Sequence, residues 1–169
     1  MIKPTTQVPE LELPLINDTR WSLHSQKSNT FTILVFYRGL HCPVCKKYLQ
    51  ALSEKLKDFS ERGVHIIAIS GDSEERAKKA GTEWNLGELP VGYGLTTETA
   101  RKWGLYISNK ISDKEPDEFS EPAIFLIRPD NTLYASSIQS MPFTRPNWDD
   151  ILNAIDFVTK NDYPARGGE

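Results

Sequence analysis

The sequence predicts an α/β fold with a central mixed β-sheet, helices on its faces and an N-terminal β-hairpin extension. Three observations lead to this prediction. Residues 31–37 are β-branched and aromatic, as in a buried strand, and apolar residues then recur at three- and four-residue steps over 44–59, as in an amphipathic helix. A second buried strand at 64–70 completes a βαβ unit. A strand, turn, strand and helix over 123–158 form the last unit.

Length and charge limit the class of protein. The chain has 169 residues and a net charge of −3 at pH 7. We expect a single domain over residues 1–169, with no preference for nucleic acid or for an anionic membrane. The first residues form no apolar run, so no signal peptide is expected, and no apolar stretch approaches membrane-spanning length. A cytoplasmic, reducing location is therefore predicted.

The elements outside the βαβ unit follow from local patterns. Residues 11–15 and 21–23 flank the turn residues Asn17-Asp18, and this strand–turn–strand pattern predicts the N-terminal hairpin. Gly63 is expected to end the helix that follows the first buried strand. Three further helices are expected to begin at good capping side chains: Asp72 or Ser73, Thr96 or Thr97, and Asn147.

Two stretches show neither a helical nor a strand period. Residues 108–119 are charged and aperiodic, so they are predicted to form an exposed loop. The tail from about residue 162 is predicted to be disordered.

The two cysteines of the chain, Cys42 and Cys45, lie three positions apart at the predicted strand-to-helix junction. The first turn of a helix has unpaired N–H groups and the positive end of the helix dipole, which lower the pKa of a thiol below its free value of about 8.5. Pro43 suits the first helical position. We therefore expect Cys42 to be the attacking sulfur and Cys45 to be the resolving thiol.

Three other interpretations of the cysteine pair compete with this one. A zinc site would need two more ligands, and the three histidines show no ligand spacing. A structural disulfide across so short a loop would stabilise the fold little, and two unrelated buried thiols would not explain the proline. A CxxC motif beside a βαβ pattern favours redox chemistry through sulfur. No metal and no other cofactor is therefore expected.

Several segments, in this order, carry a family resemblance: Phe36–Gly39 before the Cys42–Cys45 motif, Val64–Ser73, Thr99–Gly104 and Pro122–Asn131. Over residues 7–158 the chain resembles the thioredoxin superfamily, and more closely the peroxiredoxin-like alkyl hydroperoxide reductase/thiol-specific antioxidant (AhpC/TSA) family. The resemblance implies a thioredoxin-like fold and an antioxidant oxidoreductase. It also implies a thioredoxin- or glutathione-type dithiol reductant as partner.

The chain departs from the family at two positions. The family pattern Pro-x-x-x-Thr-x-x-Cys falls on Val35, Gly39 and Cys42, so only the cysteine matches. The usual active-site arginine falls on Pro122. A proline there resembles the cis-proline of thioredoxins, which implies a cis Glu121–Pro122 bond facing the CxxC motif and holding a substrate backbone. The alternative is a trans proline that begins an edge strand.

Three other side chains are candidates for shaping the site. Arg38 lies four residues before Cys42, and Arg145 lies in a segment that resembles the family's Pro-x-x-Arg segment, so either could stabilise the thiolate. His41 could carry protons. The alternatives are that the arginines are surface residues or form ion pairs, and that the His41 side chain points away from Cys42.

The function predicted from these residues is a thiol-dependent oxidoreductase. The Cys42 thiolate attacks a disulfide or a peroxide, Cys45 closes an intramolecular disulfide, and an external dithiol restores the reduced form. The sequence leaves open whether the chain acts as a monomer or a homodimer. The alternatives are a non-catalytic redox sensor or binding module with a reversible disulfide, and a structural module with inert thiols.

Overall fold

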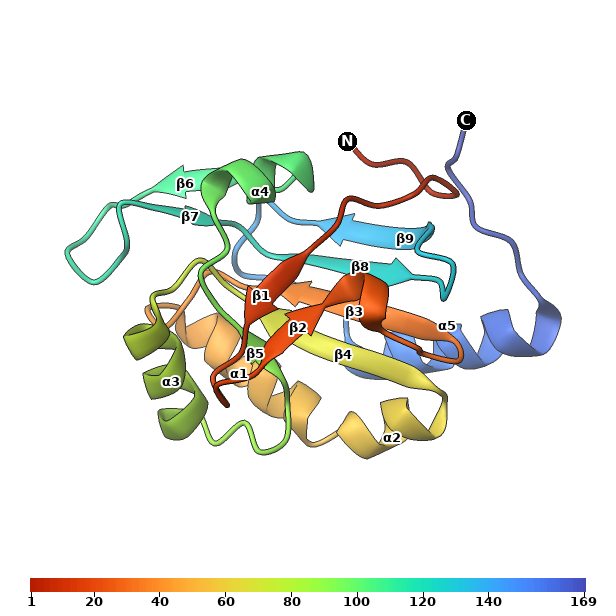
Figure 1. Ribbon diagram of the computed structural model, residues 1–169, viewed down its shortest axis with the longest axis horizontal. Helices are drawn as coiled ribbons and strands as arrows, with labels where there is room; N and C mark the ends of the chain where they lie inside the picture. Colours follow the sequence, from red (N-terminus) through yellow and green to blue (C-terminus); the bar gives the residue numbers. More distant parts are fainter.

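A computed structural model describes all residues from Met1 to Glu169. The chain forms an α/β structure whose elements follow one another as shown in Figure 1. In chain order they are β1 (Glu12–Pro14), β2 (Arg20–Ser22), the 3₁₀ turn η1 (Leu23–Ser25), β3 (Phe31–Phe36), α1 (Pro43–Ser53), α2 (Leu56–Glu61), β4 (Val64–Ile69), α3 (Glu74–Glu83), β5 (Val91–Gly92), α4 (Thr97–Lys102), β6 (Ile107–Asn109), β7 (Glu118–Ser120), β8 (Ala123–Ile127), β9 (Leu133–Ile138) and α5 (Trp148–Asn161).

The central sheet has five strands in the order β5-β4-β3-β8-β9. Strands β3, β4 and β5 run parallel, whereas β8 pairs antiparallel with β3 and β9 pairs antiparallel with β8. The predicted mixed sheet is therefore confirmed. Phe36, the last residue of β3, pairs with Ile69 of β4 and Ala123 of β8, so β3 ends between two neighbouring strands in the middle of the sheet. The cysteine motif follows directly after this strand end.

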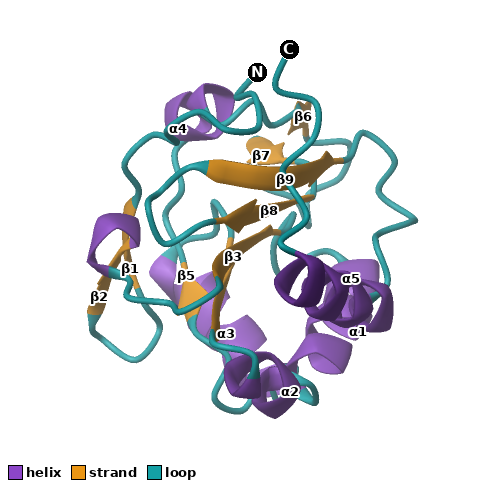
Figure 2. Cartoon of the chain, turned by 90° about the vertical axis from the view of Figure 1, so that its right-hand side faces the viewer, coloured by secondary structure: helices purple, strands orange, loops and turns teal.

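Each face of the sheet is covered by its own apolar cluster. Residues Ile33 and Val35 of β3 face α1, α2, α3 and α5, whereas Leu34 and Phe36 face the opposite cluster. Figure 2 shows these four helices on one side of the sheet and the β1–β2 hairpin and α4 on the other. Because both faces are buried, β3 is apolar along nearly its whole length. No helix is both long and apolar enough to cross a membrane.

Two predicted elements differ from the structure. The helix expected from residue 44 to Gly63 is divided into α1 and α2, and the Ser53 hydroxyl donates to the Gln50 carbonyl (2.7 Å) where α1 ends, a local bond that competes with the helix. The loop predicted over 108–119 contains most of the antiparallel pair β6–β7, in which Phe119 is buried. The period-2 pattern of that pair is too short to be recognised in the sequence.

The predicted capping residues Ser73, Thr96 and Asn147 begin α3, α4 and α5, each accepting a backbone N–H. The tail from residue 162, which the sequence predicts to be disordered, contains no helix or strand. Its first residues lie against the sheet, because the Tyr134 hydroxyl donates to the Tyr163 carbonyl (3.1 Å) and Ala165 packs on the core.

Candidate redox site

The two cysteines lie at the N-terminus of α1, as the strand-to-helix pattern predicts. Cys42 is the N-cap residue, with extended backbone angles, and Pro43 occupies the first helical position. The Cys42 sulfur accepts the N–H of Cys45 at 3.2 Å, and the two residues form a disulfide with Cα atoms 5.2 Å apart. Both residues are buried. A thiolate at Cys42 would therefore meet a backbone donor that stabilises its negative charge.

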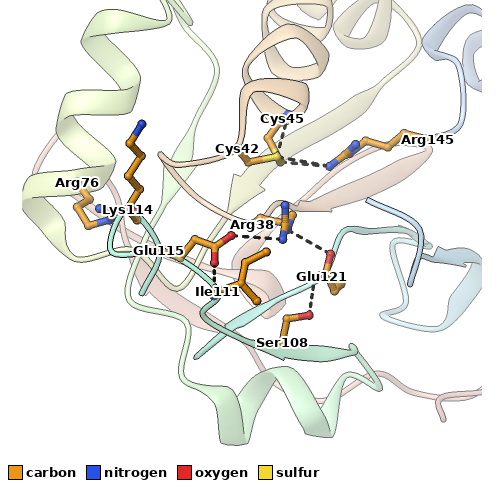
Figure 3. A network of polar contacts seen from close by, with 10 residues as sticks. All are labelled: Arg38, Cys42, Cys45, Arg76, Ser108, Ile111, Lys114, Glu115, Glu121 and Arg145. Carbon is orange, nitrogen blue, oxygen red and sulfur yellow. Dashed lines mark hydrogen bonds and ion pairs between the residues drawn. A yellow bond between two sulfur atoms is a disulfide. The ribbon is translucent and has the colours of Figure 1, made fainter. Parts of the chain in front are cut away.

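Arg145 is the cation nearest to the sulfurs. Its Nη2 lies 3.2 Å from the Cys45 sulfur and 3.9 Å from the Cys42 sulfur, and Figure 3 shows its side chain reaching the pair from the segment before α5. Burial lowers the pKa of Arg145, but a guanidinium stays charged in a protein. The structure thus places a fixed positive charge against both cysteines.

Arg38 lies near the pair but is directed elsewhere. Its Nε lies 3.3 Å from Glu121 and its Nη2 lies 3.8 Å from Glu115, and its guanidinium covers the Phe119 ring at 4.7 Å. Figure 3 shows Arg38 pointing toward these two carboxylates. The Ser108 hydroxyl also donates to Glu121 (2.6 Å). Arg38 is therefore ion-paired, which was the alternative to a role in stabilising the Cys42 thiolate.

His41 packs against the β6–β7 pair. Its ring meets the Phe119 ring edge-on at 4.7 Å, and neither ring nitrogen has a hydrogen-bond partner. Burial lowers the pKa of His41 below its ordinary 6.5, and repulsion from Arg38 lowers it further. The ring is therefore neutral at pH 7 and makes no hydrogen bond to either sulfur.

His41 makes the stability of the fold depend on pH. Below pH 6.5 the unfolded chain protonates His41 more readily than the folded chain does, so the free energy of unfolding falls as the pH drops through the lower folded-state pKa. The nearby charges of Arg38, Glu115, Asp72 and Arg76 add to this balance. When urea unfolding is measured at about pH 7.5 and at about pH 5.5, the free energy of unfolding should fall less for His41→Gln than for the wild type.

The matched control is His24→Gln, because His24 is exposed. This variant should follow the wild-type pH dependence. Equal pH slopes for His41→Gln and His24→Gln would contradict the prediction.

A groove of about 330 Å³ adjoins Arg145. Its walls come from α1 and from the segment that leads into α5, and they include Tyr48, Trp148 and the exposed Phe143.

No group of three or more His, Cys, Asp or Glu side chains is clustered as metal ligands would be.

The family of the chain follows from sequence comparison. The sequence profile of the AhpC/TSA family matches residues 4–136. The chain belongs to the AhpC/TSA family. Among its relatives are 1-Cys peroxiredoxin PER1 of Arabidopsis thaliana, 27% identical over 153 residues that cover 88% of this chain and 68% of the relative, and 1-Cys peroxiredoxin of Medicago truncatula, 24% identical over 161 residues that cover 90% and 71%.

Solved structures of related proteins share the fold of this chain. Peroxiredoxin 6 of Arenicola marina, in a cysteine-to-serine mutant, superposes with a TM-score of 0.77 at 23% identity, covering 95% of this chain and 76% of that one. The peroxidoxin BcpB of Mycobacterium tuberculosis superposes with a TM-score of 0.75 at 20% identity, covering 94% and 99%. The thioredoxin-like fold, the peroxiredoxin-like family and the enzyme class predicted from the sequence, a thiol-dependent oxidoreductase, are therefore confirmed.

The prediction of a cis bond before Pro122 is wrong for this AhpC/TSA chain, because no peptide bond is cis. The trans form is the ordinary preference of an X-Pro bond, and the local contacts accommodate it. The Glu121 N–H donates to the Tyr106 carbonyl and the Pro122 carbonyl accepts the N–H of Gln139, each at 2.8 Å. Pro122 thus leads into β8 as part of the sheet and lacks the cis geometry with which the proline of thioredoxins holds a substrate backbone.

Gly39, where the family resemblance leads us to expect a threonine, lies directly against Asp72. A Cβ atom at Gly39 would lie 2.7 Å from Asp72 Oδ1, and Gly39 has a φ of +131°. Asp72 is buried, and it accepts the N–H of Leu40 (2.8 Å) and Nε of Arg76 (2.9 Å). In this AhpC/TSA chain a buried carboxylate therefore holds the turn that presents Cys42, in the space that a side chain at residue 39 would need.

Sequence reasoning missed several residues of the site. It treated Asp72 only as a possible helix cap and placed Glu115 and Phe119 in an exposed loop. Tyr48, which lies beneath Arg145, was recognised only as part of an apolar helix face. Its position one turn after Cys45 on that face was the available indication. Nothing in the local sequence pairs Glu115 with Arg38.

Proposed function

We propose that the chain is a thiol peroxidase in which Cys42 is the attacking thiolate and Cys45 is the resolving thiol. The observation that carries the proposal is the pair of buried sulfurs at the start of α1, with a helix N–H on Cys42 and the Arg145 guanidinium against both. Backbone donors and a fixed cation favour a thiolate, which is the reactive form of cysteine.

The proposed reaction proceeds in three steps. The Cys42 thiolate attacks one peroxide oxygen, the O–O bond breaks, and the other oxygen leaves as an alcohol or water after taking up a proton. Cys45 then attacks the Cys42 sulfenic acid, water leaves, and the disulfide forms. An external dithiol reduces that disulfide and becomes oxidised itself. The peroxide and the dithiol are the proposed partners.

Protein disulfide exchange is the second candidate, because Cys42 and Cys45 close a disulfide across a CxxC motif. The trans bond at Pro122 supports peroxide as the first choice, since the site lacks the expected cis-proline that would hold a substrate backbone.

The test compares two substrates for the reduced protein. We expect stoichiometric hydrogen peroxide to oxidise the reduced protein rapidly to its disulfide. In the second assay, catalytic amounts of the protein with dithiothreitol should reduce insulin disulfides no faster than dithiothreitol alone. Insulin reduction without peroxide reaction would overturn the proposal in favour of a disulfide reductase. A reversible disulfide with slow reaction toward both substrates would indicate a redox sensor, and failure to form a disulfide under mild oxidant would indicate inert thiols.

A further inference from the structure

The two sulfurs of the disulfide have different neighbours. Cys42 accepts the N–H of Cys45, whereas Cys45 is the sulfur closer to Arg145, at 3.2 Å against 3.9 Å for Cys42. Figure 3 shows the guanidinium end of Arg145 beside the pair. The strongest stabilisation of negative charge at Cys45 would therefore come from this side chain.

The position of Arg145 is determined by contacts that do not involve sulfur. Its Nη1 donates to the Pro142 carbonyl (2.8 Å), and its guanidinium lies 5.6 Å from the centre of the Tyr48 ring. Tyr48 is itself anchored, because its hydroxyl donates to the Pro146 carbonyl (2.6 Å) and its ring stacks on Trp148 at 4.5 Å. The cation is thus held in place before any charge develops on a sulfur.

Arg145 also lacks the partner that Arg38 has. Arg38 faces the carboxylates of Glu115 and Glu121, but no carboxylate lies within ion-pair distance of Arg145. Burial lowers the pKa of Arg145, and Glu121 opposes this shift only from beyond ion-pair distance. A half-buried cation with no carboxylate in contact is unfavourable, and a thiolate formed beside it would supply a negative charge at contact distance. In the disulfide both sulfurs are neutral, so this stabilisation appears only when the S–S bond breaks.

From this geometry we infer that Arg145 is a catalytic residue of the recycling half-reaction, in which it stabilises Cys45 as the leaving thiolate. A thiolate of the reductant attacks the Cys42 sulfur and forms a mixed disulfide, the Cys42–Cys45 bond breaks, and its electron pair goes to the Cys45 sulfur beside Arg145. The second thiol of the reductant then attacks the mixed disulfide, Cys42 leaves as a thiolate, and the reductant ends as a disulfide. The inference rests on the proposed function and assigns its last step.

The first test uses the wild-type protein. The oxidised protein is mixed with the monothiol glutathione in the presence of iodoacetamide, and the products are mapped by mass spectrometry. We expect glutathione on Cys42 and the alkyl group on Cys45. Glutathione on Cys45 with the alkyl group on Cys42 would overturn the inference, because Cys42 would then be the leaving group.

The second test compares variants by stopped-flow reduction of the disulfide with dithiothreitol. Removal of a charged hydrogen-bond donor in Arg145→Gln should slow reduction about tenfold or more, and Arg145→Lys should recover part of the rate. The midpoint potential of Arg145→Gln should become more negative by about 30 mV for a tenfold loss of equilibrium constant. The matched control is Arg128→Gln, since Arg128 also lies over a tyrosine ring, 4.9 Å from Tyr134, but makes no contact with sulfur.

A rate and potential of Arg145→Gln equal to those of Arg128→Gln would overturn the inference. The inference would also be overturned if Arg145→Gln slowed the oxidation of Cys42 by peroxide, measured in a Cys45→Ser background, by the same factor as it slows reduction of the Cys42–Cys45 disulfide. Failure of the proposed function has a separate signature. The wild-type protein would then not react with peroxide, while reduction of its disulfide could still be measured.

Discussion

Cys42→Ser is expected to abolish peroxide consumption, lowering its rate at least about a thousandfold, because a serine hydroxyl does not replace a thiolate as the attacking group. The structure makes Cys42 the helix-capping sulfur, so its loss removes the group that the α1 N-terminus stabilises. The measurement is peroxide loss in a single turnover of fully reduced protein without added reductant.

The matched variant is Cys45→Ser, which removes the other half of the same disulfide. It should still consume peroxide once, losing one thiol and gaining one oxygen atom on Cys42 as judged by intact mass. The wild type should instead lose both thiols and gain no oxygen. If Cys42→Ser consumed peroxide and Cys45→Ser did not, the roles of the two cysteines would be reversed.

Gly39→Ala is expected to lower the free energy of unfolding by about 2 to 6 kcal/mol, for two reasons that add. The residue has a φ of +131°, which side chains rarely adopt, and its new Cβ would meet Asp72 at 2.7 Å. Asp72 cannot turn aside easily, because it is buried and bonded to the Leu40 N–H and to Arg76. Urea unfolding followed by tryptophan fluorescence measures the change.

The control for backbone strain alone is Gly94→Ala. Gly94 also has a positive φ, +73°, but a Cβ there would meet no atom within 4 Å. We expect a loss of only about 1–2 kcal/mol at this position. A Gly39→Ala protein no less stable than Gly94→Ala would show that the Asp72 carboxylate does not restrict residue 39. Gly39→Thr, which introduces the family's threonine, should be at least as destabilised as Gly39→Ala.

Much of the fold is readable from short stretches. The apolar runs that become β3 and β4, and the strand Leu133–Ile138, are each recognisable because burial on both faces or alternation leaves a local pattern. The caps of α3, α4 and α5 are recognisable because a capping side chain bonds to a backbone N–H two or three residues further on. The division between α1 and α2 and the pair β6–β7 leave no comparable pattern.

The candidate site likewise has one part that the local sequence indicates and another part that only folding brings together. The Cys42–Cys45 spacing, the proline between them and the helix start lie within a few residues, so chain order alone indicates them. Arg145 lies 100 positions from Cys45, and Asp72 lies 32 positions from Leu40, so only folding brings these groups together. The sequence offered both Arg38 and Arg145 as neighbours of the thiolate, and it left open which of them replaces the usual active-site arginine.

By itself the sequence determined the α/β architecture, the family and a pair of thiols at the start of a helix, because each depends on residues close along the chain or on a recognisable order of segments. The tertiary structure decided which cation meets the sulfurs. Glu115 and Glu121 draw Arg38 away, and Tyr48 and the Pro142 carbonyl hold Arg145 against the disulfide. Electrostatic stabilisation of a thiolate falls off with distance, so the choice between the two arginines depends on contacts that exist only in the folded chain.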